Sequence, residues 1–336
     1  RQPLDLDLPE RRIELAEDGT VTSVNFKDRL DAHRLIEEFM VLANVAAAET
    51  LLAKKTPLLY RIHEEPSLEK LEALRETAQA AGFTLAKGQV LHTAHLNRLL
   101  NEAAGSDDAE LILTATITAI TLGLAGPAHI GHFGLALRSY AHFTSPIRRY
   151  ADLIVHRALI TAHGWGKDGL TPEDMETLEQ TGTHISDTER RSMTAERDTT
   201  DRYLASYLSE RVGNEFTGRI SGIARFGAFV KLDETGADGL LPMRALGREY
   251  FHYDRDAQTL MGSDTGMIIS IGQRVKVRLA EAVPVTGGIA LDLLEIENQK
   301  VSPGRRSPAG RNPRRKSAKA KRKKDKIKRK VSRTRR

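Results

Sequence analysis

Apolar residues recur every three or four positions along much of the first half of the chain, a spacing typical of amphipathic helices. The clearest case begins at Asp31 and runs to about Ala53. It predicts a long core helix whose buried face consists of Leu35, Phe39, Leu42, Ala46 and Thr50 or Leu51. A second helix is expected over residues 68–81, because Ser67 can cap its start and Gly82 can end it.

Shorter elements are predicted around these helices. Residues 13–17 and 21–24 flank an Asp-Gly turn and predict a β-hairpin, which we expect at the edge of a larger sheet. Residues 57–65 contain a brief strand and residues 91–104 a further helix. Residues 172–209 form a long polar helix or a pair of helices.

The pattern changes after Val212, where apolar residues alternate with polar ones in short stretches separated by glycine-rich turns. This period of two is typical of β-strands. The stretch of about 85 residues predicts a small β-barrel, so the fold class is α+β, with a largely helical part first and a barrel second.

Residues 141–157, with the sequence AHFTSPIRRYADLIVHR, combine a predicted helix start with two adjacent arginines. Thr144 or Ser145 can accept hydrogen bonds from the first amides of a helix, and Pro146 suits the first helical position. A helix from this point would bury a stripe made of Ile147, Tyr150, Ala151, Ile154 and Ala158.

Arg148 and Arg149 lie near this predicted helix start, where the partial positive charge of the helix normally attracts acidic side chains. Two cations there are favourable if the site holds an anion, because guanidinium groups match phosphate oxygens in a bidentate way. The pair therefore predicts a phosphate site. The alternative is that Arg148 pairs with Asp152 one turn on and Arg149 is solvated.

Charge is distributed unevenly along the chain. Residues 300–336 hold 19 Lys or Arg against a single acid, Asp325, whereas the rest of the chain is acidic. Residues 298–336 are of low complexity and are expected to be a disordered, RNA-binding arm. Because the body is acidic, any RNA path through it must have a local basic lining.

Composition limits the class of protein further. The chain has no cysteine, which excludes disulfides and thiolate metal sites. It has no apolar run near the ~20 residues of a membrane span and no apolar leader, so we expect a cytoplasmic protein without a membrane partner whose chain begins within a longer protein. His92, His95 and Arg98 share a predicted face, but no carboxylate accompanies them, and no metal site is predicted.

Three blocks of sequence resemble the RNase II (RNB) family of 3'-to-5' exoribonucleases: residues 29–51, residues 131–137 (GHFGLAL) and residues 141–157. The resemblance covers most of residues 1–297. The predicted barrel, with Phe226-Gly227-Ala228-Phe229 and Asp238-Gly239-Leu240, is similar to the S1 RNA-binding domain, an OB-type barrel of five strands. Residues 111–128 depart from the family pattern, which puts any polar contacts made from there in doubt.

The resemblance implies a domain order. Residues 1–210 would be the C-terminal, largely helical part of an RNB catalytic domain, residues 211–297 an S1 domain, and residues 298–336 the basic tail. It implies processive hydrolysis of RNA to nucleoside 5'-monophosphates in RNA decay and quality control. The expected partners are single-stranded or structured RNA, with the ribosome or other RNA-decay proteins as further candidates.

The family's Mg²⁺ ions are held by an aspartate motif that is absent from this chain, so we expect the ligands upstream and the isolated chain to be inactive. The alternative is a non-catalytic RNA-binding module consisting of barrel and arm.

The resemblance and the residue pattern together give candidate site residues. Arg148, Arg149 and Glu196 are the expected catalytic residues. The expected RNA contacts are Glu37, Glu38, His132, His142, Tyr150, Arg225, Phe226, Phe229, Lys231 and His252. Several have a structural alternative: the two glutamates as a solvated pair, the first two histidines as core residues, and the phenylalanines as barrel core. His252 or Tyr253 would replace the histidine of many S1 domains, since this chain has Pro242 there.

Overall fold

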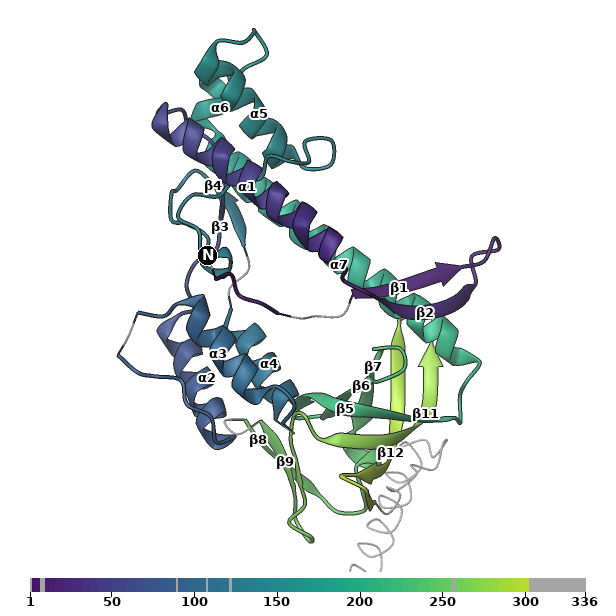
Figure 1. The fold of residues 1–336 in the computed structure, drawn as a ribbon. Coiled ribbons are helices and arrows are strands. Elements are labelled where there is room, and N and C mark those ends of the chain that lie inside the picture. The colour runs from purple at the N-terminus through teal and green to yellow at the C-terminus, as the bar shows by residue number, and fades with distance from the viewer. Residues whose placement is uncertain are drawn as a thin grey trace, which may run out of the picture.

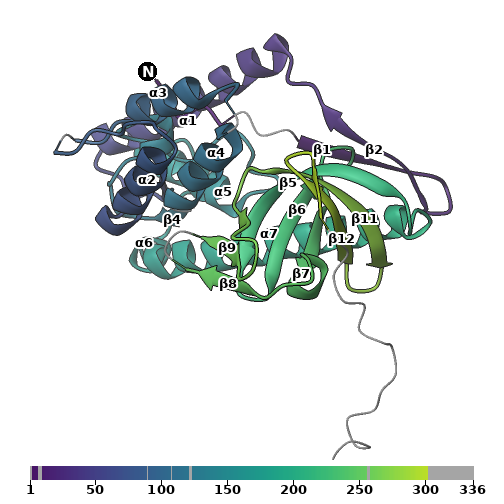
Figure 2. The same ribbon diagram turned by 90° about the horizontal axis from the view of Figure 1, so that it is seen from below.

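The computed structural model describes residues 2–6, 10–88, 90–106, 108–120, 123–255 and 258–301. A helical part and a β-barrel are joined by one long helix, α7 (Leu178–Ser209), which runs from the first into the second (Figures 1 and 2). This confirms the α+β class. Among the described residues, no helix combines the length and the apolar character that crossing a membrane requires.

The predicted hairpin is present as β1 (Glu10–Leu15) and β2 (Val21–Lys27), paired antiparallel with Ile13 opposite Val24. The expectation that it forms the edge of a larger sheet is wrong, since within the described residues β1 and β2 pair only with each other. Ile13 and Val24 pack instead against the core of the barrel. The hairpin therefore ties the start of the chain to its C-terminal domain, beside the end of α7 (Figure 1).

Helix α1 (Asp31–Ala53) has the predicted bounds, but the predicted buried face is wrong except at Leu51. Leu35, Phe39 and Leu42 are exposed, and the helix buries Val41, Asn44, Ala47, Ala48 and Leu51. The physical reason is that only the C-terminal half of α1 packs against other elements, and small alanines let α5 (Tyr150–His163) approach closely.

Helices α2 (Leu68–Ala80), α3 (Thr93–Ala103) and α4 (Ala109–Ala119) form a separate core cluster. The Ser67 hydroxyl accepts a hydrogen bond from the Lys70 amide at 3.4 Å, so the predicted cap of α2 is confirmed. Helix α4 comes from the segment that departs from the family pattern. It nevertheless packs, with Ile112 fully buried.

The remaining elements of the helical part surround a two-stranded sheet of β3 (Tyr60–Ile62) and β4 (Leu124–Gly126). A 3₁₀ turn, η1 (Phe133–Leu135), precedes α5, and α6 (Pro172–Glu176) precedes α7. Gly182 of α7 lies so close to β4 that a Cβ atom there would come within 2.6 Å of the Ala125 carbonyl oxygen. Only glycine fits at this crossing.

Five strands close the barrel: β5 (Glu215–Ala224), β6 (Gly227–Leu232), β7 (Asp238–Pro242), β11 (Arg274–Val283) and β12 (Gly288–Ile296). Their order is β11-β5-β6-β7-β12, and β11 also pairs with β12. The predicted five-stranded OB-type barrel is therefore confirmed. A second sheet, of β8 (Phe251–Asp254), β9 (Thr259–Gly262) and β10 (Ile268–Ile269), follows the 3₁₀ turn η2 (Met243–Ala245).

Residues 298–301, predicted as the start of a disordered tail, are ordered. Gln299 and Lys300 form β13 against β12, and the Val301 amide donates a hydrogen bond to the Leu294 carbonyl at 2.9 Å. Backbone pairing and the contact of Val301 with the barrel core account for this order. Residues 302–336 of the predicted tail lie outside the described residues.

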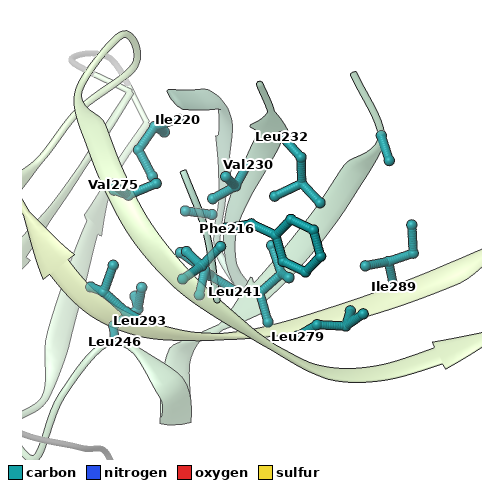
Figure 3. Close-up of a cluster of buried hydrophobic side chains, with 14 of the residues drawn as sticks. Phe216, Ile220, Val230, Leu232, Leu241, Leu246, Val275, Leu279, Ile289 and Leu293 are labelled. Carbon is teal, nitrogen blue, oxygen red and sulfur yellow. The ribbon is translucent and has the colours of Figure 1, made fainter. Parts of the chain in front are cut away.

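Alternating residues of the strands point into the barrel and fill it with aliphatic side chains, among them Ile220, Val230 and Leu241 (Figure 3). The last turns of α7 complete this core, since Leu204, Ala205 and Leu208 are buried in it. The helix that ends the first part of the chain thus stabilises the second part.

Leu208→Ala is expected to lower the free energy of unfolding by about 2–5 kcal/mol, because it leaves a cavity where α7 meets the barrel core. Urea denaturation measures the change. Leu52→Ala is the matched control: Leu52 is an exposed leucine of α1 and its replacement should cost far less. Equal effects of the two substitutions would contradict the packing of α7 into the barrel.

Candidate nucleic-acid interface

Residues 143–149, which carry the two arginines and are called the arginine loop below, are not the start of a helix. Helix α5 begins at Tyr150, with Arg149 as its extended N-cap residue, so the helix start predicted at Pro146 is wrong. The amides of Arg148 and Arg149 both donate to the Ser145 carbonyl, at 3.3 and 3.1 Å, which makes a tight turn before the helix. Ile147 and Tyr150 are exposed and do not belong to the predicted buried stripe.

A buried asparagine holds one side of this loop. Asn44 of α1 is 3% exposed. Its Oδ1 accepts hydrogen bonds from the amides of Phe143 and Thr144, at 2.9 and 3.2 Å, and its Nδ2 donates to the Tyr140 hydroxyl at 3.0 Å. These bonds fix an extended backbone where a helical cap was predicted.

A buried aspartate holds the other side. Asp152 has no exposed surface, and its Oδ1 accepts from the Ser145 amide and from Arg149 Nη2, both at 2.8 Å. The alternative pairing of Arg148 with Asp152 is therefore wrong. Arg149 makes the ion pair, whereas the Arg148 side chain is exposed at the tip of the turn.

The loop forms one wall of a pocket of about 370 Å³ whose opposite wall is α1. Thr144 and Arg149 line the pocket from the loop, together with Tyr140 and Asn44. Thr144 Oγ1 and Arg149 Nε are buried and have no hydrogen-bond partner within the described structure. Buried polar atoms are nearly always paired, so these two atoms suggest a site that is completed by a polar ligand.

A larger groove of about 1010 Å³ adjoins this pocket, because Glu37 and Leu135 line both. Its walls are residues 2–6, the first turns of α1 and one face of α3. It contains Arg29, Arg34 and Arg98 as cations, and Glu38 is among its acids. The Glu37 carboxylate accepts from Arg29 Nη2 at 2.5 Å, so it is not a merely solvated side chain.

Histidine rings lie behind the arginine loop. The ring centroids of His132 and His142 lie 5.2 and 5.9 Å from that of Tyr140. Burial, followed by the positive charge of Arg149, lowers the pKa of His142 to about 3. Burial, followed by the charge of His63, lowers the pKa of His132 to about 3. Both rings are therefore neutral at physiological pH.

An ion pair holds Arg61, whose positive charge acts on both of these histidines. Arg61 of β3 donates through Nη1 and Nη2 to the two carboxylate oxygens of Glu189 on α7, at 2.5 and 3.0 Å. Asn44 and Arg61 were missed by sequence reasoning, and Asp152 was considered only as a partner of Arg148. A polar residue on the apolar face of a helix was the available signal for Asn44.

The barrel carries the remaining predicted contacts. Phe226 is 59% exposed, Phe229 is half-buried, and their rings meet edge to face at 5.9 Å. Arg225 is exposed beside Phe226, and Lys231 points outward from β6 two residues after Phe229.

The predicted residues therefore fall into separate groups. Glu37, Glu38 and Arg149 line the adjoining pockets, with His132 and His142 behind the loop, whereas Arg148 and Tyr150 project outward from it. Glu196 lies on α7 within residues 190–199, all of which are exposed. His252 is exposed on β8. In the described part of the chain, no three His, Asp or Glu side chains gather in a way that could hold a metal ion.

Comparison with known proteins matches both parts of the chain. Residues 1–163 match the RNB domain and residues 209–293 the S1 RNA binding domain. Ribonuclease R of Escherichia coli (strain K12) is 41% identical over 282 residues, which cover 82% of this chain and 34% of that protein. Ribonuclease R of Aquifex aeolicus (strain VF5) is 36% identical over 292 residues, covering 87% and 41%.

The solved apo form of Mycoplasma genitalium RNase R aligns with a TM-score of 0.80 at 30% identity, over 87% of this chain and 46% of that one. The chain therefore belongs to the RNB family. In this chain the match to the RNB domain precedes the match to the S1 domain. Within that family, sequence and structure both place it with the ribonuclease R proteins. It spans about a third to two fifths of the length of the two curated relatives.

Asn44→Leu is expected to lower the free energy of unfolding by about 2–4 kcal/mol, because it leaves two buried amides without an acceptor. Asn44→Asp is the matched control, since its carboxylate can still accept from both amides. Chemical denaturation of the three proteins makes the comparison. An equally stable leucine variant would show that Asn44 does not hold the loop.

Stability should fall as the pH drops below about 6.5. The unfolded chain then binds protons at His132 and His142, whereas the folded chain does not until about pH 3. Each histidine can contribute a slope of up to about 1.4 kcal/mol per pH unit. Urea midpoints between pH 5 and 6.5 should therefore depend less on pH in His142→Asn. The exposed His184 supplies the control, since His184→Asn should leave the slope as it is.

Proposed function

We propose that this chain is the RNA-guiding C-terminal portion of a ribonuclease R-type 3'-to-5' exoribonuclease. The complete enzyme would hydrolyse RNA processively from its 3' end and release nucleoside 5'-monophosphates. It would work in the cytoplasm in RNA decay and quality control, with the ribosome or other decay proteins as candidate partners. The domain limits we propose are 1–210 for the RNB part, 211–297 for the S1 domain and 298–336 for the basic arm.

The observation that carries this proposal is the arginine loop. Asp152 orients the Arg149 guanidinium, and two unpartnered polar atoms of the loop are buried at a pocket that continues into a larger groove. Guanidinium donors fixed in advance favour an anion whose charge is spread over several oxygens, as in a phosphodiester under attack. The match to ribonuclease R proteins makes RNA the relevant phosphodiester.

The neighbouring residues suggest distinct roles. Arg149 would hold a phosphate of the bound strand, and the exposed Arg148 would approach the same strand from the tip of the turn. Glu37, which lines both pockets, would accept a hydrogen bond from a ribose hydroxyl, with Glu38 farther along the groove. The neutral His142 supports the loop without adding charge. Glu196 would meet the strand along the exposed stretch of α7.

The barrel would bind a more distant part of the strand. Phe226 offers an exposed ring for base stacking, and Arg225 and Lys231 supply cations near it. Two solved structures of Mycoplasma genitalium RNase R are described as complexes with ribose methylated single-stranded RNA and with double-stranded RNA. By analogy we propose single-stranded or structured RNA as the partner of this chain.

Nucleases of the RNB family generally depend on divalent metal ions. The described residues do not form a cluster of carboxylates that fits such an ion, and no step of this proposal is assigned to it. We propose that Mg²⁺ is the ion and that its ligands come from the part of an RNB enzyme that this chain does not cover. The chain alone should then bind RNA without cutting it. This is also what the alternative function, a non-catalytic RNA-binding module, would show.

The test therefore uses the chain within a protein that has a complete RNB domain. Arg148→Ala and Arg149→Ala should each lower kcat for single-stranded RNA by about 10²-fold, the scale of a positioned donor at a developing charge. Arg149→Lys keeps the charge but loses the bidentate geometry, so it should recover only part of the rate.

Arg202→Ala removes an exposed arginine of α7 outside the groove and is the matched control for charge. Thermal melting identifies variants that lose activity by unfolding. Normal turnover in folded Arg148→Ala and Arg149→Ala variants would remove the loop from the active site. If the complete protein binds RNA but never hydrolyses it in the presence of Mg²⁺, the binding-module function is correct instead.

A further inference from the structure

The small sheet of β8, β9 and β10 has one face turned to solvent. The register of its strands places His252 opposite Met261, and Met261 opposite Ile268. Directly paired residues project from the same face of a sheet. All three side chains are exposed, with Met261 at 45% and Ile268 at 52%. They therefore form one continuous row across the three strands.

The opposite face of the sheet is anchored. Phe251, Leu260 and Ile269 alternate with the exposed row and are buried in the barrel core. If the strand pairing shifted by one residue, the exposed side chains would turn into the core. The register of the three strands, and with it the set of outward-facing side chains, is therefore strongly specified. The sheet presents these side chains as a rigid surface.

Tyr250 extends the row at its β8 end. It lies two residues before His252 and is 67% exposed, and its ring meets that of His252 edge to face at 4.7 Å. Its position is fixed by the preceding residue. The Glu249 carboxylate accepts from the amides of Asp264 and Thr265, at 2.7 and 2.9 Å, and from the Thr265 hydroxyl at 2.6 Å.

The size and chemistry of this face decide between possible occupants. A stable protein interface uses roughly 20–30 residues on each side, whereas this row has four side chains. Two exposed aromatic rings in edge-to-face contact, 4.7 Å apart, suit stacking of an unpaired base, as on other sheets that bind RNA. Arg244, Arg248 and Arg255 are exposed in the same connection of the barrel. The connection also lies within the match to the S1 RNA binding domain.

We propose that Tyr250, His252, Met261 and Ile268 form a second base-stacking face for single-stranded RNA, in addition to the ring of Phe226. The inference rests on the proposed RNA-binding function of the chain. It predicts that the barrel contacts RNA at two places, and that the β8–β9–β10 face contributes affinity without reading the phosphate backbone.

Affinity of the full chain for a labelled single-stranded RNA of mixed sequence, measured by fluorescence anisotropy over a range of salt, tests this face. The double substitution Tyr250→Ala with His252→Ala should weaken binding by about 5- to 100-fold, the effect of losing one stacked base. The slope of affinity against salt should stay unchanged, because no phosphate contact is lost. Tyr250→Phe keeps the ring and should bind like the unmodified chain.

Two controls separate this inference from the proposed function. Val285→Ala changes an exposed apolar residue in the turn between β11 and β12 and should have no effect on binding. Phe226→Ala should weaken binding on its own. Unweakened RNA binding by the double variant, with weakened binding by Phe226→Ala, would overturn the second face and leave the proposed function standing. Failure of the unmodified chain to bind RNA would overturn both.

A measurement on the unmodified chain covers the case in which the double variant does not fold. RNA containing 5-iodouracil is cross-linked by light, and the modified peptide is identified by mass spectrometry. A cross-link at Tyr250 or His252 supports the proposal, and cross-links confined to other segments contradict it. Sedimentation provides one further outcome: if the double substitution abolishes a self-associated form and leaves RNA affinity intact, a second copy of the chain occupies the face.

Discussion

The buried carboxylate of Asp152 is the group on which the arginine loop depends. A carboxylate without exposed surface is costly unless donors reach it, and here the Ser145 amide and Arg149 both donate to Oδ1, whereas Oδ2 has no partner within the described structure. The same bonds that make its burial tolerable set the direction of the guanidinium. Stability and ligand binding are therefore linked at this point, because Asp152 cannot be satisfied unless Arg149 faces the pocket side of α5.

Asn44 connects the arginine loop to α1. It joins α1 to a loop about a hundred positions later in the chain, and it stands among the alanines that let α1 approach α5. The groove wall and the arginine loop are thus joined by direct hydrogen bonds. Burial and then the neighbouring charges of Arg149, Arg61 and Arg148 lower the pKa of His142 and keep its ring neutral beside the loop.

Local pattern was sufficient for α1, for the cap of α2 and for the barrel, because each has a period or a turn residue of its own. It failed for the buried face of α1, where large apolar side chains suggested a core and close packing selected small ones instead. The arginine pair was found from sequence as a candidate phosphate site. The pairing of Arg149 with Asp152 and the start of α5 at Tyr150 were not found from sequence. Both depend on Asn44 and Asp152, whose side chains accept hydrogen bonds from backbone amides that the local pattern assigns to a helix start.

The single helix α7 has a mechanical consequence. In its first half it packs against β4 and forms the Arg61–Glu189 ion pair. At its other end Leu208 is buried in the barrel core. From Glu189 to Leu208 the helix is about 28 Å long at 1.5 Å per residue. A tilt of about 5° at the ion pair would move the far end by about 2.5 Å on that length. The helix is therefore a rigid link between the two parts of the chain, and a change in its tilt at the ion pair would displace the end that is buried in the barrel core.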